Sequence, residues 1–526
     1  MALITLTPND DNTLVGAAGD TIYGFAGNDT IRALAANIIV YGGQGEDSIT
    51  GGGASSTLYG DKGNDTINSA SQSTLFGGDG NDILKATFQD DLYGDDGNDS
   101  LLGAQESDLY GGKGNDTLIA VGASNLLYGG QGNDSLVGAS GATLYGDADD
   151  DTLIGGGGGL LYGDDAKGLK LGNDVISALA GDTAYGGQGT DTLTAAASGA
   201  FMLGNQDDDW LRLADNVQGS VTLFGGQGKD TIQGRGGSSL LKGDKGSDSL
   251  VGSESNSKGD SLYGGDDGDT LFGTGAGELL VGGNLTEAAG DTTDGADYID
   301  AQGGNDTIYG GGGADTIVAG DGEDKVFGGD GADTIWAGNG NDTVFGGEGT
   351  DSIVAAAGDD KASGGAGNDT IFGGEGNDSL GGDEGNDSLY GSKGTDTLTG
   401  GAGSDFFFYV SSTITGGLDS IANLTEFGTD TITDFQSGSD KIVVSATLFQ
   451  FQNLAAGQAP GVAVVTSVDL AKSSSAVFVL NKSDGFLYYN KDGGNNATFG
   501  EPNFPDGKFL LLQGATTIVS SDFIIV

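Results

Sequence analysis

The chain has 526 residues, of which 106 are Gly, 77 are Asp or Glu and only 20 are Lys or Arg, so its formal net charge is −57. Such a chain repels itself when it is compact, and without counter-cations much of it should be disordered. The charge argues against nucleic acid as a partner. Cys and His are absent, which excludes disulfides, thiolate metal sites, H-E-x-x-H zinc sites and Ser-His-Asp triads.

The N-terminal segment MALITLTPND contains no basic region and no long apolar run, so we expect no cleaved secretory signal peptide. No stretch of the chain approaches the ~20 apolar residues of a transmembrane helix. Repeats begin within the first dozen residues, with Asp11, Asp20 and Asp29 spaced by nine. From that start we expect no catalytic or pore-forming module before the repeats.

From about residue 40 to residue 272, complete repeat motifs recur every 17 to 23 residues. Each contains glycines followed by an Asp and a large apolar residue. The aspartates are Asp47, Asp65, Asp82, Asp99, Asp116, Asp134, Asp151, Asp174, Asp191, Asp209, Asp230, Asp248 and Asp269.

A second half-turn lies between complete motifs. It keeps the large apolar residue, which is Leu58, Leu75, Leu92, Leu109, Leu127, Leu144, Leu161, Leu223 or Leu262. Two residues earlier, where the complete motif has Asp, it reads Ser56, Ser73, Asp90, Ser107, Asn125, Ala142, Gly159, Val221 and Asp260. Both strands of a coil should therefore persist, while one loop edge has largely lost its acidic residues.

An aromatic residue follows the core Leu in many of these half-turns. The residues are Tyr59, Phe76, Tyr93, Tyr110, Tyr128, Tyr145, Tyr162, Phe224 and Tyr263. Because side chains alternate along a strand, these aromatics should point outward. We expect a stacked outer ladder, with a lateral docking or glycan-binding strip as the alternative.

From residue 297 to residue 405 the repeat becomes a strict nonapeptide. One Asp recurs every nine residues: Asp297, Asp306, Asp315, Asp324, Asp333, Asp342, Asp351, Asp360, Asp369, Asp378, Asp387, Asp396 and Asp405. The stretch GGDGADTIWAGNGNDTV, residues 328–344, shows the unit G-G-x-G-x-D-x-U-x, in which U is a large apolar residue. The residues two positions after each Asp, Ile299 to Phe407, should form a core stripe.

The chemistry of the unit favours calcium. Gly is needed where φ is positive or where two backbones approach closely, so the glycines make tight turns with inward carbonyls. The Asp adds a charged oxygen. Hard oxygen ligands in a flexible loop suit Ca²⁺, whereas Mg²⁺ demands a tighter octahedron. We expect roughly twenty ions, about one per well-formed loop. They should lie on one loop edge up to about residue 272 and on both edges from about residue 297.

Three interruptions break the repeats, at residues 166–171, 252–259 and 283–296, and composition changes sharply after Asp405. The segment 430–442 reads D-T-I-T-D-F-Q-S-G-S-D-K-I, and the segment 484–490 reads D-G-F-L-Y-Y-N, which predicts a hairpin. The side chains of Asn490 and Asp492 could offer oxygens to one further ion, although a plain hairpin turn is the simpler interpretation.

The nonapeptide resembles that of the RTX family, and segment 430–442 resembles the signature that follows RTX repeats. The resemblance covers most of the chain. It implies a right-handed parallel β-roll, with Ca²⁺ between loops eighteen residues apart, so that Asp306 would share an ion with the loop of Asp324. It also implies export by a type I secretion machinery that reads an uncleaved C-terminal signal. The last residues, Ser521–Val526, look like that signal. They can also be read as a final strand, and the two interpretations are compatible.

We therefore predict an all-β protein with three regions: a β-roll with mainly one calcium edge (1–296), a roll with two calcium edges (297–405), and a β-rich cap with the secretion region (406–526). The metal ligands should be Asp20 and Asp29 together with the aspartates of both repeat series given above. The predicted location is extracellular, at the cell surface.

The favoured function is a calcium-folded structural protein of a bacterial surface, such as an S-layer, coat or fibril, which assembles as a homo-oligomer. It resembles RTX surface proteins more than RTX toxins or proteases. An adhesin that binds surface polysaccharide is the main alternative. We expect no enzyme; a carboxylate-based lyase or glycosidase is the least favoured hypothesis, since nearly all phased carboxylates are assigned to Ca²⁺.

Overall fold

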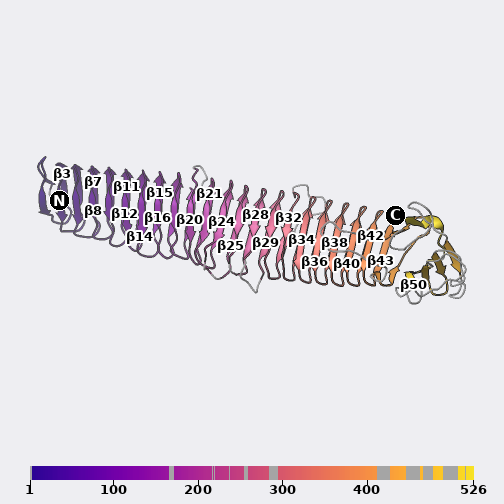
Figure 1. Cartoon of the computed structure of the whole chain (residues 1–526). Coiled ribbons are helices and arrows are strands. Elements are labelled where there is room, and N and C mark those ends of the chain that lie inside the picture. The colour runs from indigo at the N-terminus through magenta and orange to yellow at the C-terminus, as the bar shows by residue number, and fades with distance from the viewer. Residues whose placement is uncertain are drawn as a thin grey trace. The chain divides into compact units, whose positions relative to one another are not determined.

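The structure is a computed structural model. It describes residues 3–164, 171–215, 217, 219–235, 237–253, 259–283, 294–410, 427–445, 462–465, 478–489, 508–515 and 517–526. The chain divides into two compact units, Met1–Asn256 (unit 1) and Ser257–Val526 (unit 2), which are considered one by one. Each is a coil in which the chain alternates between two ladders of parallel strands, A and B, and ladder A includes an antiparallel segment near the C-terminus of unit 2 (Figure 1). The predicted all-β parallel roll is confirmed.

Unit 1 contains 28 described strands. Ladder A consists of β1 (Leu3–Thr5), β3 (Thr21–Ala26), β5 (Ile39–Gln44), β7 (Thr57–Lys62), β9 (Thr74–Asp79), β11 (Asp91–Asp96), β13 (Asp108–Lys113), β15 (Leu126–Gln131), β17 (Thr143–Ala148), β19 (Leu160–Asp164), β21 (Thr183–Gln188), β23 (Phe201–Gln206), β25 (Thr222–Gln227) and β27 (Leu240–Lys245). Ladder B consists of β2 (Asn12–Val15), β4 (Thr30–Ala33), β6 (Ser48–Gly51), β8 (Thr66–Asn68), β10 (Ile83–Lys85), β12 (Ser100–Gly103), β14 (Thr117–Ala120), β16 (Ser135–Val137), β18 (Thr152–Ile154), β20 (Val175–Ala178), β22 (Thr192–Ala195), β24 (Trp210–Leu213), β26 (Thr231–Gln233) and β28 (Ser249–Val251).

Unit 2 continues the same plan. Ladder A contains β29 (Ser261–Asp266), β31 (Leu279–Val281), β33 (Thr307–Gly312), β35 (Lys325–Asp330), β37 (Thr343–Glu348), β39 (Lys361–Ala366), β41 (Ser379–Glu384), β43 (Thr397–Ala402), β45 (Asp430–Ile432), β47 (Val462–Val465), β48 (Phe478–Asn481), β49 (Phe486–Tyr489) and β50 (Lys508–Leu512). Ladder B contains β30 (Thr270–Phe272), β32 (Tyr298–Asp300), β34 (Thr316–Asp321), β36 (Thr334–Asn339), β38 (Ser352–Ala357), β40 (Thr370–Glu375), β42 (Ser388–Lys393), β44 (Phe406–Tyr409), β46 (Lys441–Val444) and β51 (Phe523–Ile525). A 3₁₀ turn, Ser520–Asp522, precedes β51.

The core of each unit is a stripe of apolar side chains contributed by successive strands. Equivalent residues pair across neighbouring rungs; Leu92, for example, pairs with Leu109 in ladder A and Leu84 with Leu101 in ladder B. Leu58 to Leu262 of the predicted series, and Ile299 to Phe407, are buried. Each fully buried Leu or Ile contributes ~1.5–3 kcal/mol of burial free energy. The sequence-based assignment of the core is confirmed.

An outward-facing aromatic stack follows ladder A of unit 1. Its centroid separations are 4.7–5.2 Å and its interplanar angles 4–12°. The rings are Tyr23, Tyr41, Tyr59, Phe76, Tyr93, Tyr110, Tyr128, Tyr145, Tyr162 and Tyr185. The predicted ladder is confirmed from Tyr59 to Tyr162 and is longer than expected. It ends at Tyr185, because Leu203 occupies the next rung. Phe224 instead contacts Phe201 edge-on.

The end of unit 2 closes the coil with strands of its own. β45 and β46 extend the two ladders, and β48 and β49 form the predicted antiparallel hairpin. β51 pairs in parallel with β46. Asp522 precedes β51 and is fully buried; its carboxylate accepts hydrogen bonds from the Gly438 N–H and the Ser437 hydroxyl at 2.9 and 2.6 Å. The C-terminal segment is therefore a final strand.

Some expectations fall on residues that are not described. The three interruptions lie largely there, as do Asn490 and Asp492. Among the described residues, no helix is both long enough and apolar enough to cross a membrane.

Candidate calcium sites

A ladder of buried aspartates follows one loop edge of unit 1. This AB edge consists of the loops that lead from a ladder A strand to the next ladder B strand. One Asp stands directly before each ladder B strand, where its carboxylate reaches back to the previous turn. Oδ1 of Asp47 accepts a hydrogen bond from the N–H of Asp29, and Oδ1 of Asp65 accepts one from Asp47, both at 2.7 Å. The series runs from Asp11 to Asp248 with bonds of 2.7–2.9 Å.

In most aspartates of this series the second carboxylate oxygen accepts no hydrogen bond. Within the described part of unit 1, Oδ2 is buried and accepts no hydrogen bond in Asp29, Asp47, Asp65, Asp82, Asp99, Asp116, Asp134, Asp151, Asp174, Asp191, Asp209 and Asp230. A buried ionised oxygen without a partner costs several kcal/mol. A cation in contact with these oxygens would offset this free-energy cost at every turn.

A backbone carbonyl from the next turn faces the same space. A Cβ placed on Gly60 would collide with Oδ2 of Asp65 and with the carbonyl oxygen of Gly77. A Cβ on Gly77 would meet Oδ2 of Asp82 and the Gly94 carbonyl in the same way. The missing side chain therefore keeps open an oxygen-lined gap between successive turns.

The donor set fits Ca²⁺. Among the described residues, no group of three His, Cys, Asp or Glu side chains that could hold a metal ion is found. The oxygens come instead from aspartates of the ladder and from backbone carbonyls such as that of Gly94. Hard anionic and carbonyl oxygens in tight, glycine-rich loops are the ligands that Ca²⁺ takes.

Electrostatics support the same conclusion. Burial, together with a smaller effect of the carboxylates on neighbouring turns, raises the pKa of Asp47 to about 6 and that of Asp151 to about 9. The backbone hydrogen bond to Oδ1 opposes this shift only in part. Without a cation, each turn therefore places a carboxylate where its charged form is disfavoured.

Unit 2 carries aspartate ladders on both loop edges. On its AB edge the series runs from Asp269 to Asp440, with bonds of 2.6–3.3 Å. The BA edge, made of the loops that lead from ladder B to ladder A, has a second series from Glu278 to Asp430. Oδ2 is again buried without a hydrogen-bond partner in Asp297, Asp315, Asp324, Asp333, Asp342, Asp351, Asp360, Asp369, Asp378, Asp387 and Asp405.

The two edges of unit 2 differ at the position five residues before the ladder Asp in three of the turns. On the BA edge, Ala319, Ala337 and Ala355 stand five residues before the Asp, where the AB edge has Gly, and all three are buried. That edge accommodates the methyl group.

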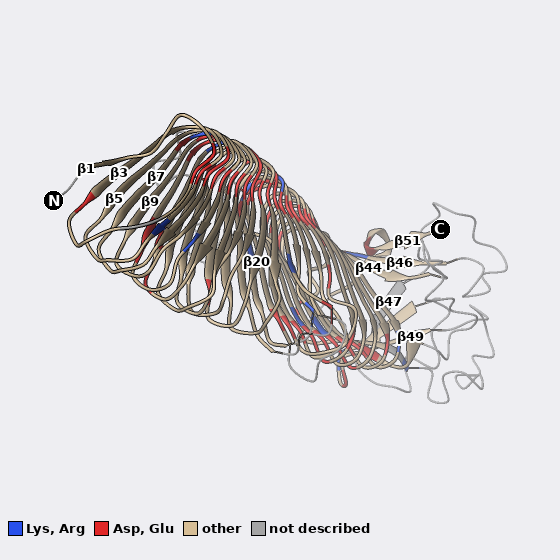
Figure 2. Ribbon diagram, turned by 90° about the vertical axis from the view of Figure 1, so that its left-hand side faces the viewer, with Lys and Arg blue, Asp and Glu red and all other residues tan. Residues whose placement is uncertain are grey.

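The BA edge of unit 1 has a different construction. The inter-turn hydrogen bond persists, but short polar side chains accept it. Ser73 Oγ accepts from Ser56 N–H at 3.2 Å, Asp90 Oδ1 from Ser73 N–H at 2.7 Å, and Ser107 Oγ from Asp90 N–H at 3.2 Å. Figure 2 shows this contrast: acidic residues gather along one loop edge of the N-terminal turns, while the opposite edge is nearly free of them.

The aspartates that remain on this edge use both oxygens within the protein. Oδ2 of Asp90 accepts from the Thr87 N–H, and Oδ2 of Asp182 from the Leu179 N–H, each at 2.7 Å. The predicted ligand Asp20 also lies on this edge, and its Oδ2 accepts a hydrogen bond from Ala17 N–H at 3.0 Å. The structure therefore places Asp20 apart from the other predicted ligands, which all belong to the aspartate ladders.

Sequence reasoning missed two groups of residues. The first continues the ladders beyond the strict repeat: Glu278, and Asp430 and Asp440, whose Oδ1 atoms accept from Asp396 and Asp405 N–H at 2.9 and 3.3 Å. Segment 430–442 contains both Asp430 and Asp440, each at or next to the start of a strand. The second group is the Asn that often precedes the ladder Asp, for which the recurrent dipeptide Asn-Asp was the available signal.

Comparison with protein families agrees with this geometry. The model of the RTX calcium-binding nonapeptide repeat matches residues 9–37, 41–73, 70–92, 76–109, 110–142, 143–159, 171–198, 224–258, 291–326, 318–353, 345–380 and 381–409. No curated protein matches the chain. Because the matched segments cover well over half of its length, the chain belongs to the family of RTX calcium-binding nonapeptide repeat proteins, whose repeats bind Ca²⁺.

Proposed function

We propose that this protein is a secreted structural component of a bacterial surface, a coat, S-layer or fibril that folds and assembles when it binds Ca²⁺ outside the cell. The observation that carries the proposal is the ladder of buried aspartates, whose uncompensated charge at turn after turn supports a fold that depends on cations. Type I secretion would export the chain while it is still free of Ca²⁺, before these carboxylates are neutralised outside the cell.

The ladder residues themselves explain the coupling between calcium and folding. Oδ1 of each Asp fixes the spacing of two turns, and Oδ2 with the facing Gly carbonyl leaves an oxygen-lined gap. Bound Ca²⁺ supplies positive charge and oxygen coordination in that gap, and its binding free energy becomes folding free energy. In a cytoplasm poor in free Ca²⁺, the unneutralised carboxylates oppose compaction.

The outer aromatic stack favours a structural role over sugar binding. At separations of 4.7–5.2 Å the faces of neighbouring rings, such as Tyr93 and Tyr110, cover one another. The surface therefore offers ring edges and hydroxyls, whereas stacking on a sugar needs a free ring face. We infer that the stack stiffens ladder A and offers a regular surface for lateral packing of copies.

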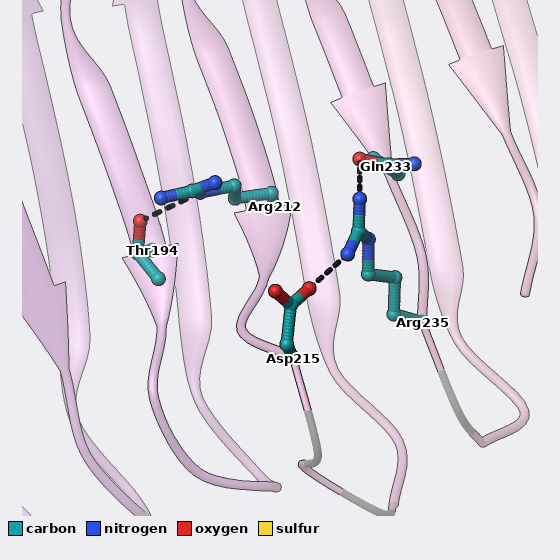
Figure 3. Close-up of polar contacts among 5 residues, drawn as sticks. All are labelled: Thr194, Arg212, Asp215, Gln233 and Arg235. Carbon is teal, nitrogen blue, oxygen red and sulfur yellow. Dashed lines mark hydrogen bonds and ion pairs between the residues drawn. The ribbon is translucent and has the colours of Figure 1, made fainter.

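One observation favours the alternative, an adhesin that recognises an acidic surface polysaccharide. Two of the three arginines in the chain lie close together on the outer side of ladder B in unit 1 (Figure 3). The Arg212 guanidinium lies 4.6 Å from the Trp210 ring centroid, and its Nε donates to the Thr194 hydroxyl. Arg235 pairs with Asp215 and donates to Gln233. We propose no catalytic role, because the phased carboxylates lie between the turns.

The deciding experiment is electron microscopy of purified protein in millimolar Ca²⁺ and in chelator. The surface-coat proposal expects ordered sheets or filaments with Ca²⁺ and none with chelator. Monodisperse particles in Ca²⁺ that bind acidic polysaccharide, and lose this binding in Arg212→Ala, would replace the proposal with the adhesin.

A further inference from the structure

A second ladder of side chains runs beside the aspartate ladders, and its side chains reach in the opposite direction along the coil. Its members stand immediately before the ladder aspartates, on the solvent side of the loop. Oδ1 of Asn81 accepts a hydrogen bond from the N–H of Asn98, one turn later, at 2.7 Å. Oδ1 of Asn98 in turn accepts from Asn115 N–H at 2.7 Å. Each asparagine therefore reaches forward, whereas each aspartate reaches back.

The two ladders brace each gap reciprocally. Between the turns of Asp82 and Asp99, the N–H of Asp82 donates to Oδ1 of Asp99, while the N–H of Asn98 donates to Oδ1 of Asn81, both at 2.7 Å. One bond satisfies a backbone donor of the earlier turn and the other a donor of the later turn. Opposed bonds from adjacent residues resist sliding of one loop past the next in either direction.

The same arrangement recurs in both units. In unit 1 the acceptors are Asp10, Asn28, Asn64, Asn81, Asn98, Asn115, Asp150, Asn173 and Asp208, with bonds of 2.7–3.0 Å. In unit 2 they are Asn305, Asn341, Asp359, Asn368, Asn377 and Asn386, with bonds of 2.7–3.1 Å. Asp replaces Asn at several positions, so the shared requirement is a short side chain with an Oδ1 acceptor.

We propose that these residues, termed the asparagine clamp, are positioning residues for the calcium sites. The clamp holds adjacent loops at the spacing of one turn without needing an ion, so that Oδ2 of the aspartate and the facing carbonyl are already in place when Ca²⁺ arrives. Preorganisation of this kind raises affinity by lowering the ordering cost of binding. The inference rests on the calcium-dependent folding put forward under the proposed function.

The test compares three sets of substitutions in the full-length protein. The first removes four consecutive acceptors, Asn64, Asn81, Asn98 and Asn115, by replacement with Ala. The second replaces the same four with Asp, which keeps Oδ1. The control replaces Gln44, Gln131, Gln206 and Gln227 with Ala; these exposed amides lie on the same AB loop edge, three residues before the ladder Asp. Circular dichroism measures the Ca²⁺ concentration at the folding midpoint, and amide hydrogen exchange measures protection at residues 81, 98, 115 and 133.

The clamp predicts that the Ala set raises the calcium midpoint by roughly threefold or more, in line with the loss of several hydrogen bonds, and loses protection at these four amides. The Asp set and the Gln control should keep the wild-type midpoint within about a factor of two and retain protection. Should the Ala set not fold at any Ca²⁺ concentration, the single variant Asn98→Ala is compared with Asn98→Asp by the same exchange measurement.

Equal midpoints and equal protection in the Ala set and the Gln control would overturn the clamp. A calcium midpoint that rises as far in the Asp set as in the Ala set would also overturn the clamp, because Asp retains the Oδ1 acceptor. A wild-type protein without any calcium transition would overturn the proposed function and the clamp together, so the two failures are distinguishable.

Discussion

The N–H of Asp82 donates to Oδ1 of Asp99 at 2.7 Å, while Oδ2 of Asp99 is buried without a hydrogen-bond partner. The two oxygens of one carboxylate therefore have separate roles. One links neighbouring turns of the protein, and the other faces the oxygen-lined gap. This division allows the structural and the metal-binding contributions of the ladder to be separated by substitution.

Replacement of Asp82, Asp99 and Asp116 by Asn should keep an oxygen for the inter-turn bond and remove the buried charge. We expect fewer bound Ca²⁺ ions and a higher calcium midpoint. In chelator, however, residual β-structure should be stabilised by about 1–3 kcal/mol, because an uncompensated buried charge is removed. Isothermal titration calorimetry gives the ion count, and circular dichroism gives stability in chelator. Glu46→Gln, an exposed carboxylate in a neighbouring loop, is the control; an unchanged ion count in the triple variant would contradict the assignment.

Asp90→Asn tests whether the two edges of unit 1 differ. Asp90 accepts from the Ser73 and Thr87 N–H groups with separate oxygens, so both of its oxygens have protein partners, unlike Oδ2 of Asp99. We expect the number of bound ions to equal that of the wild type, with a loss of about 1 kcal/mol of stability from a weakened charge-assisted bond. The comparison variant is Asp99→Asn on the AB edge. If both variants lost the same number of ions, the BA edge of unit 1 would also bind calcium.

The pH dependence of the calcium-free protein follows from the raised pKa values. Burial raises the pKa of Asp82 to about 6 and that of Asp209 to about 9, whereas an exposed Asp has a pKa of 3.8. The folded state therefore binds more protons than the unfolded state at intermediate pH, and unfolding free energy increases as pH falls. In chelator, β-structure should increase between about pH 9 and pH 5. A pH titration by circular dichroism with excess chelator measures this.

With saturating Ca²⁺ the same titration should show the opposite trend, because protons compete with the ion for the carboxylates. The paired titrations thus separate protonation from ion binding. A chelated protein whose β-signal decreased on acidification would contradict the assignment of raised pKa values to the ladder.

Leu109→Ala tests the shared core. Leu109 is fully buried between Leu92 and Leu127 of the neighbouring rungs. The lost burial and the cavity should cost about 2–5 kcal/mol of unfolding free energy in Ca²⁺. Denaturant unfolding measures the change. Val121→Ala, at a side chain that is 69 % exposed, is the matched control and should shift stability by less than about 0.5 kcal/mol. Similar effects in the two variants would mean that the apolar stripe is not a packed core.

The sequence alone determined the coil, its core stripe and most of its aspartate ladders. A solenoid repeats its local environment, so each position in a turn carries one requirement, and periodicity exposes it: Asp before the strand, and a large apolar residue two positions later. The outward position of Tyr59 to Tyr162 followed from strand alternation in the same way.

The tertiary structure decided what periodicity cannot express, because stacking brings together residues of different turns. Asp20 and Asp29 are nine residues apart and look alike in the sequence, yet they lie on opposite loop edges, and Asp20 accepts a bond from its own loop. Asp430 lies 34 residues beyond Asp396 but occupies the next rung. Which oxygen links the protein and which faces a cation is a relationship between neighbours in space, and only the stacked turns define it.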